Sequence, residues 1–67
     1  MASITTLKTL ARDLKNLTVQ EGAKVWKGRR QTVFYVRIGD VDHIFGNTST
    51  VKNATTQDIT DWLNSLP

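Results

Sequence analysis

The chain has 67 residues, no cysteine and a formal net charge of +3 at pH 7. Its length suits one domain, near the lower limit for folding without a disulfide, a metal or a partner. The absence of cysteine excludes disulfides, thiol chemistry and thiolate zinc sites. No apolar run approaches the roughly 20 residues of a membrane span, and residues 1–4 lack a signal-peptide pattern. We therefore expect a soluble, cytoplasmic protein that makes no membrane contact.

The charge is divided unevenly along the chain. Residues 1–37 hold eight Lys and Arg against Asp13 and Glu21, a net +6. Residues 38–67 hold one Lys against four Asp, a net −3. This distribution is compatible with an anionic partner. An ordinary solvated surface with a chance skew is the alternative, and the charge count leaves both open.

Residues 3–18 are predicted to form an amphipathic helix. Ser3 is suited to the N-cap position. Apolar residues follow at the 3.6-residue period of a helix: Ile4, Leu7, Leu10, Ala11, Leu14 and Leu17. The β-branched residues and glycine of the segment 18–22 are expected to end the helix.

Three strands are predicted next, over residues 23–27, 31–38 and 41–45. The last two are joined by Gly39-Asp40, a strong hairpin signal because tight two-residue turns need a positive φ, which glycine adopts freely. The turn between the first two strands is predicted within residues 28–30, with two possible centres. Both centres give the same alternation of side chains, so the assignment of each residue to a face holds for either.

The Gly39-Asp40 turn sets the register of the second hairpin and therefore which side chains share a face. It places Arg37 opposite Asp42, as an exposed cross-strand ion pair, and Phe34 opposite Phe45. The remaining predicted pairs are Ile38 with Val41, Val36 with His43, and Tyr35 with Ile44. One face is almost entirely apolar and is expected to be the core: Ala23, Val25, Phe34, Val36, Ile38, Val41, His43 and Phe45. The other face is expected to be open to solvent: Lys24, Trp26, Val33, Tyr35, Arg37, Asp42 and Ile44.

Residues 46–54 are polar and are predicted to be a loop or an irregular extension of the third strand. Thr55 or Thr56 can then cap a short helix, with Asp58 in its first turn. Its apolar stripe consists of Ile59, Trp62, Leu63 and Leu66. Both helices have one apolar stripe and only one sheet face is apolar. We therefore predict a single α+β domain over residues 1–67, in α-β-β-β-α order, a two-layer sandwich with a three-stranded antiparallel sheet and both helices on one face.

Eight cations are candidate phosphate contacts. The first predicted turn holds three of them in close sequence: Lys27, Arg29 and Arg30. The first helix holds three at i, i+4 and i+7: Lys8, Arg12 and Lys15. The open sheet face holds two: Lys24 and Arg37. Because Lys and Arg neutralise phosphate charge, these are the predicted nucleic-acid-binding residues; a solvated turn and a solvated helix face are the alternative.

The open face also carries three large side chains beside the cations: Trp26, Tyr35 and Ile44. Aromatic rings flanked by cations suit base stacking with phosphate neutralisation. They equally suit a protein interface or self-association, since Trp, Tyr and Arg are frequent hot-spot residues. A third interpretation is a small cluster that only stabilises the sheet, with Lys and Arg stems lying over the rings.

The residue patterns do not point to catalysis, a cofactor, a metal site or a small-molecule substrate. His43 is the only histidine, and the register puts it on the opposite face from Asp42. We expect it to face the core with a hydrogen-bond partner rather than to act as a ligand or base. No serine lies beside a plausible base, and no Gly-rich phosphate loop is present.

The α-β-β-β-α order at this length resembles that of the double-stranded RNA-binding domain. In that family RNA is held by helix 1, by the loop between the first two strands and by a Lys-rich start of helix 2. The cations of the first helix and first turn match the first two positions, whereas residues 52–56 offer only Lys52 at the third. Three strands followed by a helix are also similar to the DNA-binding arm domains of phage-type integrases, which read DNA with the sheet face.

The resulting hypothesis is a non-catalytic binding module that contacts DNA or RNA through the basic turn and the first helix. The alternative is a protein-interaction module or a small inhibitor, encoded by a phage or a mobile element. It binds a protein partner, or itself as a homodimer, through the exposed sheet face. The charge asymmetry favours the first hypothesis, and the aromatic and aliphatic side chains of the open face favour the second.

Overall fold

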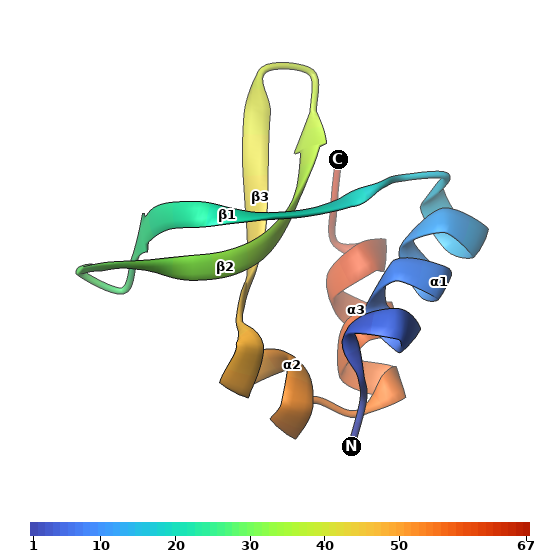
Figure 1. Ribbon diagram of the computed structural model, residues 1–67. Coiled ribbons are helices and arrows are strands. Elements are labelled where there is room, and N and C mark those ends of the chain that lie inside the picture. The colour runs from blue at the N-terminus through green and yellow to red at the C-terminus, as the bar shows by residue number, and fades with distance from the viewer.

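A three-stranded antiparallel sheet and three helices follow one another in the order α1, β1, β2, β3, α2, α3 (Figure 1), in a computed structural model that describes residues 1–67. The strands are β1 (Val19–Trp26), β2 (Arg29–Ile38) and β3 (Val41–Asn47), with β2 in the centre. The helices are α1 (Ile4–Lys15), α2 (Thr48–Asn53) and α3 (Thr56–Asn64). The predicted α+β fold with an antiparallel sheet is confirmed. None of the helices has the length and apolar character needed to cross a membrane.

Helix α1 begins as predicted and ends three residues early. The Ser3 hydroxyl accepts the backbone N–H of Thr6 at 3.2 Å, which caps the helix. At the other end Asn16 adopts the left-handed conformation, with φ 55°, and so closes the helix. Because the helix ends there, β1 begins at Val19, four residues before the predicted strand, and Val19 is buried in the core.

The prediction of a loop over residues 46–54 is wrong for its central part, which forms α2. The Asn47 side chain accepts the backbone N–H of Thr50 at 2.9 Å and caps this helix. Val51 is 1% exposed and packs in the core. Thr, Ser and Asn favour helices weakly, so the local composition indicates a loop; one cap and one buried side chain reverse that preference. The next helix, α3, is capped as predicted, by a reciprocal pair of bonds between Thr55 and Asp58.

The predicted register of the β2–β3 hairpin is confirmed near its turn and wrong at its base. Four pairs are as predicted: Ile38 with Val41, Arg37 with Asp42, Val36 with His43, and Tyr35 with Ile44. A β-bulge then makes Phe34 face Gly46 instead of Phe45. Phe45 still reaches the helices, where its ring meets that of Trp62 edge-on at a centroid distance of 5.0 Å.

The helices cover one face of the sheet, and the core lies between them. Val19, Phe34 and Val36 from that face are buried together with helical side chains: Leu7, Ala11, Val51, Ile59 and Leu63. Val41, next to the turn of the β2–β3 hairpin, was predicted to join this core but is 57% exposed. Two further residues predicted to join it, Ala23 and Val25, are exposed as well. Figure 1 shows the reason, because the end of the β1–β2 hairpin extends beyond the helices, so nothing covers it.

The opposite face is less open than predicted. Val33 is fully buried and Tyr35 is only 8% exposed. The Tyr35 ring lies under the Lys24 ammonium, 4.5 Å from the ring centroid, and its hydroxyl donates to Gln20 at 3.4 Å. A side-chain carbon added to Gly22 would touch this ring at 3.5 Å, so the ring also packs against the β1 backbone. Tyr35 is therefore part of the sheet's own packing.

Candidate nucleic-acid interface

The β1–β2 hairpin ends in a two-residue turn formed by Lys27-Gly28. Trp26 and Arg29 form the last pair of the ladder, and φ is +52° at Lys27 and +79° at Gly28. Positive φ at both central residues is the signature of a type I′ turn. The turn lies slightly before the predicted centres, but the alternation of faces is the same, so Lys24 and Trp26 share a face as predicted.

Lys27 is an unusual residue for its place in this turn. Asn, Asp and Gly are the residues that tolerate the left-handed conformation, and for other side chains it costs on the order of 1 kcal/mol. The Lys27 ammonium lies over the Trp26 ring, 4.8 Å from its centroid. A cation–π contact at an exposed site is worth about 0.5–1 kcal/mol, which offsets part of this cost. The contact holds the Lys27 side chain against Trp26.

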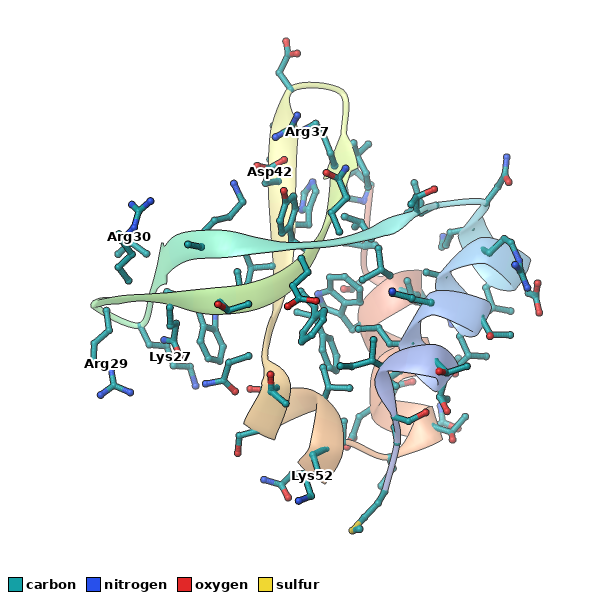
Figure 2. The ribbon with its side chains drawn as sticks, viewed as in Figure 1. Lys27, Arg29, Arg30, Arg37, Asp42 and Lys52 are labelled. Atoms are coloured by element: carbon teal, nitrogen blue, oxygen red, sulfur yellow. The ribbon has the colours of Figure 1, made fainter.

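Three exposed cations gather at this tip: Lys27, Arg29 and Arg30. None of them takes part in an ion pair, since the salt bridges of the molecule lie elsewhere. Residues 22–32 contain no acidic side chain. Figure 2 shows Arg29 and Arg30 pointing to opposite sides of the hairpin, as neighbours on a strand must. The tip therefore presents positive charge on both of its sides, and no carboxylate neutralises it.

A chain of side-chain hydrogen bonds connects the tip to the helical layer. The Gln31 amide donates to the backbone carbonyl of Trp26 at 2.8 Å, and the Asn47 amide donates to Gln31 at 2.9 Å. Asn47 is also the N-cap of α2. The hairpin is thus braced against the body of the molecule and does not depend on its ladder alone.

Sequence reasoning missed Gln31 and Asn47 as supporting residues. Extrapolating the regular register of the β2–β3 hairpin would place Asn47 opposite Thr32, on the other face of the sheet from Gln31. The bulge shifts the pairing by one residue, so Asn47 faces Val33 and reaches the Gln31 side. A bulge depends on packing between distant elements, and no local pattern indicated it.

The two cations predicted on the open sheet face, Lys24 and Arg37, are already bound within the molecule. Arg37 donates two hydrogen bonds to Asp42, at 2.6 and 3.1 Å, and the Lys24 ammonium lies 2.7 Å from the same carboxylate (Figure 2). The hydrogen bonds from Arg37 and then Lys24 hold the pKa of Asp42 far below its usual value. The Asp42 carboxylate raises the pKa of Arg37. The predicted Arg37–Asp42 pair is confirmed, and Lys24 completes a triad that the sequence did not indicate.

The helical cations Lys8, Arg12 and Lys15 are exposed, but they do not join the hairpin tip in one surface. Figure 1 shows α1 on the far side of the molecule from the Lys27-Gly28 turn. Arg12 is within 3.6 Å of Asp13 at an exposed position. Lys52, the only cation near the start of the last helices, lies on α2 and points away from the tip (Figure 2). The three regions that hold RNA in the double-stranded RNA-binding domain therefore do not form one surface in this protein.

The proposed partner surface of Trp26, Tyr35 and Ile44 is not a continuous exposed patch. Tyr35 is buried, whereas Trp26 and Ile44 are half-buried. Of the three, Trp26 alone lies at the exposed end of the hairpin, beside the basic tip. His43 is half-buried on the core-facing side, as predicted, but its ring makes no side-chain hydrogen bond. No three His, Asp or Glu side chains come together in a way that could hold a metal ion.

No protein-family model, curated protein or solved structure matches this chain.

Proposed function

We propose that this protein is a non-catalytic module that binds nucleic acid through the tip of its β1–β2 hairpin, with Lys27, Arg29 and Arg30 as the phosphate contacts. The observation that carries the proposal is three exposed cations without an ion pair at the tip of a projecting hairpin whose outer part, residues 22–32, holds no acidic residue. Phosphate contacts from Lys and Arg supply most of the affinity of non-specific nucleic-acid binding.

The energetics of the isolated tip support this proposal. Three like charges close together repel one another, and Lys27 also adopts a backbone conformation that costs free energy. A turn needed only for connection would be more stable with asparagine or glycine at this position. An anionic partner relieves this repulsion, and a phosphate contact explains why a lysine occupies this position.

Bracing of the hairpin also favours binding. The hydrogen bonds from Asn47 to Gln31 and from Gln31 to Trp26 hold the end of the ribbon in place before any partner arrives. Because less conformational freedom is lost when a preorganised segment binds, the free-energy cost of association is lower.

The alternative of a protein interface or inhibitor surface centred on Trp26, Tyr35 and Ile44 has less support. Its central ring, Tyr35, is covered by Lys24 and packed against Gly22. The interpretation of a small cluster that only stabilises the sheet explains Tyr35 and Ile44. Trp26 is explained by its contact with Lys27 at the hairpin tip.

The decisive experiment compares two triple variants that remove the same charge from different places. We would measure fluorescence anisotropy of short labelled duplex DNA, duplex RNA and single-stranded DNA across a range of salt concentrations. The variant K27A/R29A/R30A should lose about tenfold or more in affinity at low salt and lower the salt slope by up to about three. The matched variant K8A/R12A/K15A should stay within about threefold of the wild type, with only long-range electrostatics affected.

Two results would overturn the proposal. One is undetectable binding of the wild-type protein to all three probes at low salt. The other is an equal loss in both triple variants, which would mean that net charge and not the tip determines binding. Circular dichroism of both variants shows whether the fold is retained, as expected for exposed positions.

A further inference from the structure

One face of the β1–β2 ribbon is exposed along its whole outer part, where no helix covers it. The face is formed by alternate residues of β1 and β2. Val25 pairs with Arg30 across the two strands, and Ala23 pairs with Thr32. All four are exposed, and Val25 is 66% exposed, the most of any valine in the chain. The residue alternation assigns Ala23 and Val25 to the core face, yet the helices end before they reach this part of the ribbon.

This face has the chemistry of a base-reading surface. It combines an arginine, a threonine and two small apolar side chains on a two-stranded ribbon. Arginine binds guanine through two hydrogen bonds, threonine hydrogen-bonds to base edges, and small apolar groups contact the thymine methyl group. Glu21, the next residue inward on the same face, marks the limit of this surface because its carboxylate would repel phosphate.

We propose that this face, formed by Ala23, Val25, Arg30 and Thr32, enters the major groove of double-stranded DNA and contacts base edges. Arg30, counted among the phosphate contacts in the proposed function, then contacts a base edge, and Lys27 and Arg29 contact the phosphates that border the groove. The proposal rests on the proposed function and names its ligand. The major groove of B-form DNA is about 12 Å wide and admits a two-stranded ribbon, whereas the major groove of A-form RNA is too narrow for side chains to read.

Charge and area favour DNA over a protein partner on this face. The tip carries three cations without an ion pair, and the apolar part of the face consists only of the small side chains of Ala23 and Val25. A stable protein interface needs a larger patch with an apolar centre. Base reading requires only a few side chains, because the phosphate contacts supply most of the affinity.

The test begins with selection of preferred sequences from a randomised duplex library by the wild-type protein. Affinity for the selected duplex is then compared with that for a scrambled duplex. The variant R30A should lower this preference about fivefold or more, as expected for the loss of a bidentate contact to a base, and V25A should lower it by a smaller factor because it removes only an apolar contact. The matched control is V41A, because Val41 is 57% exposed beside the turn of the other hairpin and should leave the preference unchanged.

A change in the DNA provides a second, independent readout. Replacing thymine by uracil at the contacted position removes the methyl group. This replacement should weaken wild-type binding and have no effect on V25A.

The outcomes separate this inference from the proposed function. If the wild type binds all nucleic acids equally, with no selected sequence and no effect of V25A, the groove-reading inference is wrong while the proposed function stands. Absence of any binding overturns both. Light scattering that shows a dimer, converted by V25A to a monomer, would also overturn the inference, because a second copy would then cover this face.

Discussion

The two hairpins of this sheet share β2, but they differ in turn geometry and in whether their cations are paired with a carboxylate. The β2–β3 hairpin turns at Gly39-Asp40, where glycine takes the one positive φ, +62°, as in a type II′ turn. The β1–β2 hairpin turns at Lys27-Gly28 and places a lysine at φ +52°. Beside the first of these turns, Arg37 and Lys24 share the carboxylate of Asp42; beside the second, no carboxylate is present.

This contrast shows that the pairing of cations locates a site better than their number does. The chain has nine Lys and Arg, and its N-terminal part is strongly positive. Lys24 and Arg37 look as available as the tip cations in the sequence, but Asp42 occupies both. After these are set aside, two groups of cations remain, one on α1 and one at the hairpin tip. The tip is the group without any ion pair, because Arg12 of α1 lies beside Asp13.

The largest expected effect is a loss of stability when Gly46, at the base of the β2–β3 hairpin, is substituted. Gly46 is buried in β3 at φ +155°, and an added side-chain carbon would lie 2.6 Å from Thr50 of α2. Gly46→Ala should therefore lower the free energy of unfolding by on the order of 3 kcal/mol, through backbone strain and overpacking. Urea unfolding followed by circular dichroism measures the loss.

The matched control is Gly22→Ala at the base of the other hairpin. There the added carbon would make ordinary contact with Tyr35, at 3.5 Å, so the free energy of unfolding should change by less than about 1 kcal/mol. Equal losses in the two variants would contradict the view that only the β2–β3 hairpin is tightly packed against a helix.

The next effect separates stability from binding at the basic tip. Lys27→Asn creates the preferred Asn-Gly turn, so the free energy of unfolding should be unchanged or rise by up to about 1 kcal/mol. Affinity for nucleic acid should fall about threefold because one phosphate contact is lost. Arg29→Asn, at a strand position, removes the same charge and should weaken binding without any gain in stability. A lower stability of Lys27→Asn would refute the claim that Lys27 is strained.

The smallest effect concerns the triad in the second hairpin. Asp42→Asn should destabilise the protein slightly at pH 7 and release Lys24 and Arg37, which should raise affinity for nucleic acid about threefold. Asp40→Asn makes the same change in net charge at an exposed position without an ion pair, and is the control. Equal gains in the two variants would mean that net charge, and not release of paired cations, controls binding.

The pH dependence gives a separate check on this triad. Because folding lowers the pKa of Asp42, its contribution to stability is complete above the unfolded value of about 3.9. The contribution is lost as the pH falls from there through the folded value. The stability difference between the wild type and Asp42→Asn should therefore be largest at pH 7 and shrink below about pH 4, as urea midpoints at several pH values would show.

Local patterns in the sequence account for the three strands, for helices α1 and α3 with their N-caps, and for the pairing next to the Gly39-Asp40 turn. Each of these depends on residues close together in the chain: the Ser3 cap, the Thr55–Asp58 capping box and a two-residue turn. The alternation of strand residues also assigned each side chain to the correct face between Lys24 and Ile44. These features can be read from neighbouring residues because their energies come from neighbouring residues.

Features that depend on contacts between distant segments required the tertiary structure. The bulge before Gly46, the helix at Thr48–Asn53 and the burial of Tyr35 all arise where separate elements meet. The exposure of Val25 follows from where the helices end, which no pattern in the strand itself records. The same reason applies to the candidate site: the sequence supplied eight cations, and only the packing distinguished the two held by Asp42 from the three left free at the hairpin tip.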